Sequence, residues 1–187
     1  MIIFAYDFPH KKTIDFIIHC VLRGFKISAI VGAPPAKLNI PKSKIRSKIR
    51  HENFYHPSEL ANAFEIPYKV MPHNSLELES YLKNLKPDLG LISGARILKS
   101  NIIDTFETGI INFHPGLIPE ARGLDALSWS ILNNIDLGVT SHLIDHKVDA
   151  GRILDVGRHS ELVTRNALYA KMVELQFRET AAQNVEK

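Results

Sequence analysis

The stretch LGLISGARILKSNIIDTFETGIINFHPG, residues 89–116, decides the fold that we predict for this chain. Two short apolar runs, at residues 89–94 and 108–113, stand on either side of a segment with the spacing of a short helix, residues 96–106. Buried parallel strands are short and nearly continuously apolar, and each returns to the sheet through a crossover connection that is usually a helix. The stretch therefore predicts one strand, a short helix and a second strand parallel to the first.

The same alternation continues on both sides of this unit. Upstream, the pattern predicts strands at residues 1–6, 25–32 and 66–71 and helices at residues 11–24, 56–64 and 75–86. Downstream, it predicts a helix at residues 126–134, a hairpin or bend of two strands at residues 137–145 and 151–159, and a closing helix at about residues 161–183. Ser58 is the expected N-cap of its helix. The sequence thus predicts the α/β class, with one domain over residues 1–187 that holds a doubly wound, mostly parallel sheet with helices on both faces.

The composition is that of a globular protein with a sizeable core, because 45% of the 187 residues are hydrophobic and 23% are charged. No apolar run is long enough to cross a membrane, and the first ten residues lack the basic region of a signal peptide. The single cysteine, Cys20, lies in an apolar segment, so no internal disulfide is expected. We therefore expect a cytoplasmic protein without a membrane partner.

Three common motifs are missing from the sequence. It has no G-x-G-x-x-G after the first predicted strand, no P-loop and no G-x-S-x-G, so dinucleotide, P-loop and serine-hydrolase functions lose their main support. His142, Asp145 and His146 lie close together, but His142 and Asp145 should point to opposite faces of a strand. No bound metal is expected.

Asn112 and His114 are the first candidates for a catalytic site. They lie two residues apart at the end of a predicted strand, so both side chains point to one side, at the edge of the sheet where ligands gather. A carboxamide beside an imidazole can stabilise negative charge on a carbonyl oxygen and carry a proton near neutral pH. Asp149, before Ala-Gly, supplies a carboxylate that can hold the imidazolium or accept a proton. A structural, half-buried histidine is the alternative that these residues alone leave open.

The segment of residues 111–154 resembles the signature of the folate-dependent formyltransferases, the group that contains glycinamide ribonucleotide, methionyl-tRNA and nucleotide-sugar N-formyltransferases. The matching motifs are Asn-x-His-Pro at 112–115, Leu-x-Pro at 117–119, Arg-Gly at 122–123, Gly-Val-Thr at 138–140 and Val-Asp-x-Gly at 148–151. The resemblance extends less strongly over residues 1–180. It implies a Rossmann-like sheet of the formyltransferase type.

The resemblance also implies a reaction: transfer of a formyl group from 10-formyltetrahydrofolate, a co-substrate, to a primary amine. In that family the residues matching Asn112 and His114 hold the formyl oxygen and stabilise the oxyanion of the tetrahedral intermediate. The residue matching Asp149 keeps the histidine cationic and helps to remove a proton from the attacking amine. No covalent enzyme intermediate and no metal are required.

The family's pterin pocket consists mainly of backbone groups from a strand-to-helix turn and from the loop before the catalytic aspartate. The matching residues are Arg96, Ile97 and Leu98 in the turn and Asp145, His146, Lys147 and Val148 in the loop. Core packing is the alternative role for Ile97 and Leu98. Thr140 is a weaker candidate, since threonine is common in strands.

The branches of that family differ in the amine that they formylate. Glycinamide ribonucleotide enzymes carry a glycine-rich phosphate loop after the first strand, but residues 5–13, AYDFPHKKT, contain no glycine. Methionyl-tRNA enzymes have a basic loop that resembles residues 33–50, yet they usually add a C-terminal β-barrel domain, and a net charge of +3 is small for a tRNA partner. A solvated loop is the simpler interpretation of those charges.

The Pro-Gly after His114 is closer to the enzymes that act on nucleotide-linked amino sugars, so we predict such a small-molecule acceptor. The two other acceptors stay open as alternatives. The candidate substrate-binding residues are Lys44, Arg46, Lys48 and Arg122, and the candidate stacking residues are Phe8, Tyr55 and Trp129. A catalytically silent folate- or ligand-binding module is the non-enzyme alternative, against which the complete Asn-His-Asp set argues. The sequence leaves the oligomeric state open, a homodimer included.

Overall fold

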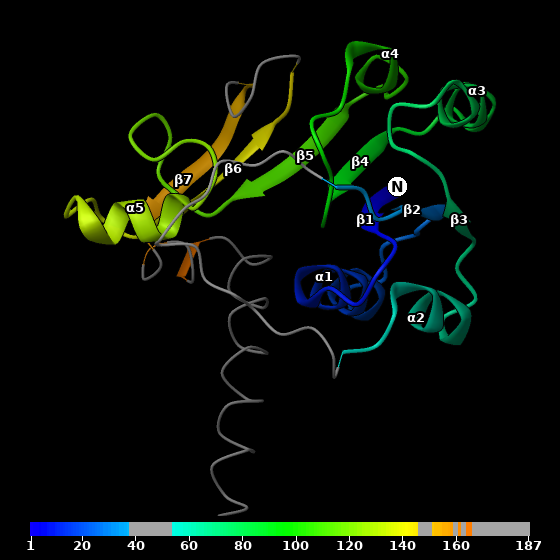
Figure 1. Ribbon diagram of the computed structural model, residues 1–187, viewed down its shortest axis with the longest axis horizontal. Helices are drawn as coiled ribbons and strands as arrows, with labels where there is room; N and C mark the ends of the chain where they lie inside the picture. Colours follow the sequence, from blue (N-terminus) through cyan, green and yellow to red (C-terminus); the bar gives the residue numbers. More distant parts are fainter. Residues whose placement is uncertain (38–53, 146–150, 159–160, 162–163, 166–187) are drawn as a thin grey trace, which may run out of the picture.

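The computed structural model describes residues 1–37, 54–145, 151–158, 161 and 164–165. Seven strands form one sheet in the order β3-β2-β1-β4-β5-β6-β7 (Figure 1). The strands are β1 (Ile2–Tyr6), β2 (Ala29–Ala33), β3 (Tyr68–Val70), β4 (Leu89–Ile92), β5 (Gly109–His114), β6 (Gly138–Leu143) and β7 (Ile153–Arg158). Strands β1 to β5 are parallel, β6 pairs antiparallel with β5, and β7 pairs antiparallel with β6. The predicted mostly parallel sheet is therefore confirmed.

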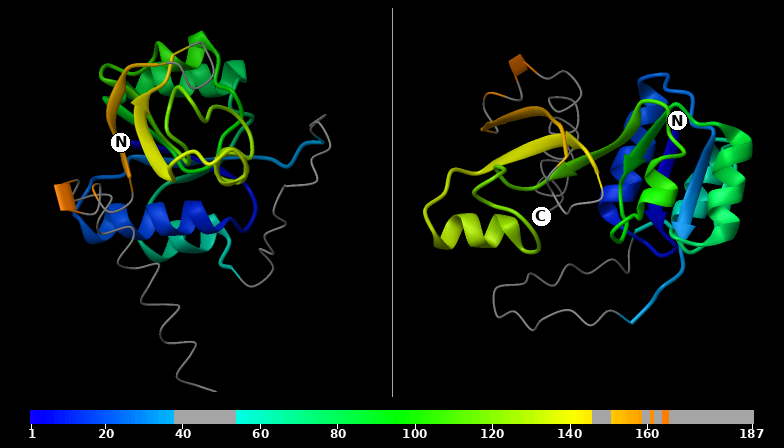
Figure 2. Two further views of the ribbon diagram at one scale, coloured as in Figure 1. Left: turned by 90° about the vertical axis from the view of Figure 1, so that its left-hand side faces the viewer. Right: turned by 90° about the horizontal axis from the view of Figure 1, so that it is seen from above.

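Helices cover both faces of the parallel part of the sheet (Figures 1 and 2). The helices are α1 (Lys11–Leu22), α2 (Pro57–Ala63), α3 (Leu76–Leu85), α4 (Ser100–Ile103) and α5 (Ala126–Leu132). Helices α1 and α2 pack on one face and α3 and α4 on the other. Because the chain winds away from β1 in both directions, the strand order reverses between β1 and β4. Ligand crevices of doubly wound sheets open at such a switch point, outside the carboxyl ends of the strands.

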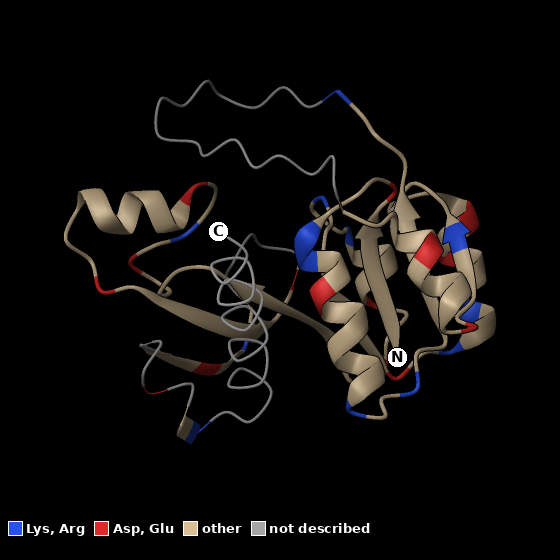
Figure 3. Ribbon diagram, turned by 90° about the horizontal axis from the view of Figure 1, so that it is seen from below, with Lys and Arg blue, Asp and Glu red and all other residues tan. Residues whose placement is uncertain are grey.

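Strand β1 is the centre of the core and is buried on both faces. Ile2 and Phe4 pack with α3 and α4, whereas Ile3 and Ala5 pack with α1 and α2. All four are 0% exposed, which is typical of a parallel strand covered on both sides. Neither β1 nor β2 contains a charged residue, and charges lie mainly on helices and connections (Figure 3). None of the helices in the described part of the chain is long and apolar enough to span a membrane.

Two predicted elements begin four residues later in the structure than expected. The strand expected at residues 25–32 begins only at Ala29, because Ala29 pairs with Ile2, where β1 itself begins. The helix expected at residues 96–106 is reduced to α4, because the chain before it forms an irregular turn tied to neighbouring elements.

The prediction of Ser58 as the N-cap of α2 was wrong. His56 occupies this position, and its Nδ1 accepts a hydrogen bond of 3.3 Å from the Ser58 amide. Glu59 completes the capping box by accepting a 2.6 Å hydrogen bond from the His56 amide. Pro57 takes the first helical position, where its missing amide hydrogen costs nothing, and this moves the cap to His56.

The two predicted strands at residues 137–145 and 151–159 are confirmed as β6 and β7, which pair antiparallel. The helix predicted at residues 126–134 is confirmed as α5. Most of the basic loop and most of the closing helix lie outside the described residues.

Candidate active site

Strand β5 presents Asn112 and His114 on the α3/α4 face of the sheet. Ile110 packs in the core with α3 and α4, and Phe113 packs in the core with α1, so alternation gives Asn112 and His114 the face of Ile110. Asn112 is also in register with Ile92, the last residue of β4. The pair thus lies beside the turn that leaves β4, as the sequence predicted.

Asn112 is held by a neighbour that the sequence analysis considered only as a metal ligand. Its Nδ2 lies 3.2 Å from Nε2 of His142, the residue opposite it on β6, and His142 is only 1% exposed. The amide nitrogen donates, so Nε2 of a neutral His142 accepts. Because a carboxamide has two hydrogens, one contact with His142 leaves the second for an oxygen of a ligand. The described residues contain no cluster suited to a metal ion.

His114 is turned toward the loop that follows β5. Its Nε2 donates a 2.7 Å hydrogen bond to the carbonyl oxygen of Ala121, and the residue is 4% exposed. This bond places a hydrogen on Nε2 and fixes the plane of the imidazole. The loop is fixed in turn by Thr140, whose buried hydroxyl donates to Gly116 O at 2.7 Å and accepts from Ile118 N at 3.0 Å. Both hydrogen-bonding directions of Thr140 are therefore used by protein groups.

The turn after β4 contains the first predicted folate-binding residues. Arg96 donates from Nη2 to Pro34 O at 2.9 Å, and Tyr6 donates to Ala95 O at 3.0 Å. Ile97 is 66% exposed, whereas Leu98 is 3% exposed and belongs to the core with α3 and α4. The side chain of Leu98 is thus used for packing, and that of Ile97 faces outward.

Asn74, which the sequence analysis did not select, stabilises this turn. Its Nδ2 donates to Ile97 O at 2.9 Å, and its Oδ1 accepts from Lys99 N at 2.8 Å. The amides of residues 96–98 make no hydrogen bond with any residue in the described ranges. A turn with fixed carbonyls, whose amides lack such partners, can bind the polar edge of a planar ring. This observation fits the backbone pocket that the resemblance implies.

Two ionisable side chains near the turn have shifted pKa values. Burial raises the pKa of Tyr6, against the opposing charge of Arg96. Burial lowers the pKa of His73, a 3% exposed residue that the sequence analysis missed. His73 donates from Nε2 to Val31 O at 3.1 Å, and its ring makes a T-shaped contact with Phe4. Both groups are therefore uncharged at neutral pH.

The second predicted folate-binding segment is only partly described. Asp145 is half-buried, while His146, Lys147, Val148 and the predicted catalytic Asp149 lie outside the described residues. In the flanking chain, Leu143 N donates to Arg152 O at 2.9 Å, and Leu143 lies opposite Ile111, the neighbour of Asn112.

The predicted substrate-binding residues are not brought together in the described part of the chain. Arg122 is exposed in the loop before α5, and Lys44, Arg46 and Lys48 lie outside the described residues.

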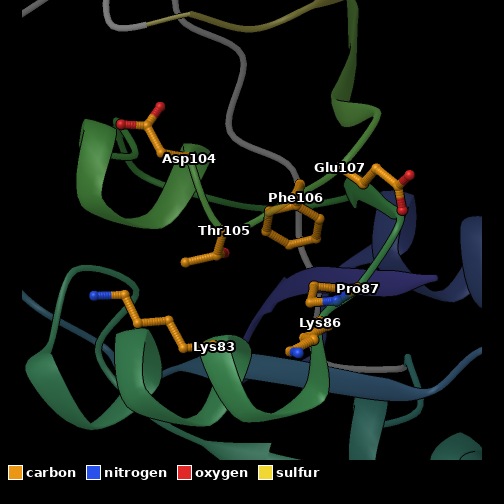
Figure 4. A pocket seen from close by; sticks show the side chains of 7 residues that line it. All are labelled: Lys83, Lys86, Pro87, Asp104, Thr105, Phe106 and Glu107. Carbon is orange, nitrogen blue, oxygen red and sulfur yellow. The ribbon is translucent and has the colours of Figure 1, made fainter.

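A shallow hollow lies at the opposite edge of the sheet (Figure 4). Pro87 comes just before β4 and Phe106 shortly before β5, so this hollow is at the amino ends of the parallel strands. Its lining residues are Lys83, Lys86, Pro87, Asp104, Thr105, Phe106 and Glu107. None of the predicted site residues is among them, and the carboxyl edge stays the candidate site.

The fold is a Rossmann-like α/β domain. Its candidate polar groups lie at the carboxyl edge of the sheet, near the switch point and at the end of β5. The family model described as formyl transferase matches residues 29–171. The chain therefore belongs to the formyl transferase family, and the predicted folate-dependent formyltransferase class is confirmed at the level of the family.

Curated relatives of the chain include methionyl-tRNA formyltransferases. The enzyme of Mycoplasma genitalium is 30% identical over 134 residues, which cover 69% of this chain and 39% of the relative. The enzyme of Borreliella afzelii is 37% identical over 87 residues, which cover 46% of this chain and 27% of the relative. The chain spans less than half the length of the curated relatives that it matches.

Solved structures share the fold at low sequence identity. Phosphoribosylglycinamide formyltransferase from Brucella melitensis has a TM-score of 0.60 and 21% identity, with 93% of this chain and 90% of that chain covered. A sugar N-formyltransferase from Shewanella has a TM-score of 0.56 and 18% identity, with 83% of this chain and 55% of that chain covered. The predicted formyltransferase-type fold is confirmed.

Proposed function

We propose that this chain catalyses the transfer of a formyl group from 10-formyltetrahydrofolate to a primary amine. The observation that carries the proposal is the pair at the end of β5: Asn112, oriented by His142, and His114, fixed by Ala121 O, on one face of the sheet. The turn at residues 96–98, whose amides make no hydrogen bond with the described residues, lies beside this pair and is the proposed pterin site.

In the proposed mechanism, the formyl oxygen accepts a hydrogen bond from the second hydrogen of the Asn112 amide and a further one from the imidazolium of His114. The amine adds to the formyl carbon, and the negative charge that develops on the oxygen is stabilised by these donors. The bond between the formyl carbon and N10 of the folate then breaks as the new amide forms. Asp149 and His114 transfer the proton of the amine to the departing N10.

We propose a nucleotide-linked amino sugar as the acceptor. The connection between β1 and α1 supports it, because this connection holds Asp7 and no glycine, and a carboxylate there repels the phosphate that a glycinamide ribonucleotide brings. Methionyl-tRNA is the second candidate, because the curated relatives are named as methionyl-tRNA formyltransferases. A cytoplasmic location, where folate co-substrates and both kinds of acceptor occur, stays part of the proposal.

The test is to incubate the full chain with 10-formyltetrahydrofolate and separate acceptors: amino sugars linked to nucleoside diphosphates, methionyl-tRNA and glycinamide ribonucleotide. We expect mass spectrometry to find one formyl group on the amine of a nucleotide-linked sugar. Formylation of methionyl-tRNA alone would replace the proposed acceptor with the second candidate. Formylation of none of them, with the folate consumed or not, would overturn the proposed function.

A further inference from the structure

The residue that follows β1, Asp7, is built into a polar cluster on the α1/α2 face of the sheet. It continues the alternation of Ile3 and Ala5, which both pack against α1 and α2. Its backbone amide donates to Ala33 O at 2.8 Å, which extends the pairing of β1 with β2 by one residue. The position of the Asp7 carboxylate is therefore set by the sheet.

Two further elements contribute side chains to this carboxylate. Tyr68, at the start of β3, donates from its hydroxyl to Oδ1 of Asp7 at 2.8 Å. His56, the N-cap of α2, places Nε2 at 3.7 Å from the same oxygen. Because Nδ1 of His56 accepts from the Ser58 amide, Nε2 carries a hydrogen on the side of Asp7. Burial, the hydrogen bond to Asp7 and the charge of Asp7 all raise the pKa of Tyr68, which keeps its proton.

Gly32 shows that the sheet is shaped around this cluster. A β-carbon on Gly32 would lie 2.4 Å from the hydroxyl oxygen of Tyr68 and 3.3 Å from Cβ of Asp7. Glycine weakens the interior of a strand, and in such positions it often marks the close approach of another group. Here Gly32 lets the ring of Tyr68 cross β2 and reach Asp7.

The cluster still has hydrogen-bonding capacity on its exposed side. The side chain of Asp7 is 22% exposed and that of His56 is 32% exposed. Oδ2 of Asp7 accepts no hydrogen bond from any residue in the described ranges. The cluster therefore offers carboxylate and hydroxyl oxygens as acceptors and an imidazole N–H as a donor. Hydroxyl groups, which both donate and accept, match this set, whereas a phosphate would meet the carboxylate charge.

The strand register gives the position of the cluster relative to the proposed catalytic pair. Phe4 of β1 is in register with Ile92, and Ile92 with Asn112, so Tyr6 is level with His114. Two strand spacings separate β1 from β5 along the edge of the sheet, a distance of about 10 Å. Asp7 thus lies one residue beyond this level, on the other face.

Lys12 of α1 reaches the end of β5 from the α1/α2 face. It donates from Nζ to the carbonyl oxygen of Phe113, between Asn112 and His114, at 3.1 Å. A ligand that extends from the pair to Asp7 passes a positive charge on the way, and this order of groups matches an amine, then an anionic linker, then hydroxyls.

We propose that Asp7, positioned by Tyr68 and His56, binds the ribose hydroxyls of a ribonucleoside diphosphate that carries the acceptor sugar. This inference rests on the proposed function and deepens it by naming the carrier of the amine. A carboxylate binds ribose hydroxyls in the same way in dinucleotide-binding sheets, where it also follows a strand end. The diphosphate then lies near Lys12, and the amino sugar reaches Asn112 and His114.

The test measures the binding of uridine and guanosine diphosphates and of their 2′-deoxy and 3′-deoxy counterparts to the full chain by calorimetry, without folate. We expect the wild type to bind at least one ribonucleotide about 10-fold more tightly than one of its deoxy counterparts, the size of one hydrogen bond to a charged group. Asp7→Asn keeps the shape of the side chain and an oxygen for Tyr68. It should lose this preference by binding the ribonucleotide more weakly and the deoxy form equally well.

The matched control is Asp104→Asn, an exposed carboxylate at the opposite edge of the sheet, which should keep the preference. Thermal unfolding of the three proteins checks that Asp7→Asn is folded. A wild type without ribose preference or without binding, or a preference that Asp7→Asn retains, overturns the inference. Formyl transfer to another acceptor in the absence of diphosphate binding would leave the proposed formyl transfer standing. Ribose-dependent binding without formyl transfer would overturn the proposed function and leave the ribose site at Asp7.

Discussion

The carboxyl ends of β5 and β1 differ in how their polar groups are held. At the end of β5, His114 is fixed by a backbone carbonyl and Asn112 by a buried histidine, so the protein sets the position of both side chains. At the end of β1, Asp7 is held by side chains from two other elements and is partly exposed. The first arrangement suits stabilisation of a transition state, and the second suits recognition of a substrate. Substitutions at β5 should therefore lower kcat for every acceptor, whereas those at β1 should change the affinity for particular acceptors.

The largest effect is expected for His114→Ala. It removes the group that we propose to stabilise the oxyanion and carry the proton, so kcat should fall about 10³-fold with any acceptor. Single-turnover formylation at saturating folate and acceptor measures this step. Asp7→Asn serves as the comparison, because its kcat at saturating acceptor should stay within a few-fold of the wild type. A near-normal kcat for His114→Ala would contradict the proposal that the end of β5 stabilises the transition state while the end of β1 recognises the substrate.

A smaller effect on kcat is expected for His142→Phe. The phenyl ring fills the buried space but cannot accept the hydrogen bond from Asn112, so the amide loses its orientation and kcat should fall about 10-fold to 100-fold. His142→Gln supplies a carbonyl oxygen as acceptor and should restore part of the rate. Folate binding, measured by fluorescence titration, should change little in either variant. Equal rates for the two variants would show that His142 acts by packing alone.

The interior of the sheet could be predicted from sequence, whereas the contacts between polar groups could not. Apolar runs such as residues 89–94 predict buried strands directly. Asn112 and His114 could be selected because the alternation of side chains along one strand depends on local sequence alone. The contact of Asn112 with His142 depends on the register of two strands that are 30 residues apart. The contact of Asp7 with Tyr68 joins residues 61 positions apart and depends on Gly32 in a third strand. No short-range sequence pattern predicts either of these contacts between distant strands.

Thr140→Val should destabilise the β5 side without removing any group from the proposed chemistry. The substitution leaves Ile118 N and Gly116 O without their buried partner, at a cost of about 2 kcal/mol in the free energy of unfolding. Urea unfolding followed by circular dichroism measures the change. Thr140→Ser keeps the hydroxyl and should lose less. A valine variant as stable as the serine variant would mean that the loop of residues 115–121 does not depend on this hydroxyl.

The smallest effect is expected for the pH dependence of stability, at the buried His73 beside β1 and β2. Burial, assisted by the charge of Arg96, lowers the pKa of His73 in the folded chain, whereas hydrogen bonding to Val31 O opposes the shift. The unfolded chain then binds the proton more tightly, with an ordinary histidine pKa of about 6.5. The stability from a neutral His73 is thus complete above about pH 6.5 and is lost as the pH falls toward the lower, folded value, with a slope of at most about 1.4 kcal/mol per pH unit. His73→Asn should reduce the slope of unfolding free energy between pH 7 and pH 5, measured by urea titration at each pH. An unchanged slope would assign the acid sensitivity to other histidines, and the buried ring beneath β1 and β2 would then be a packing element only.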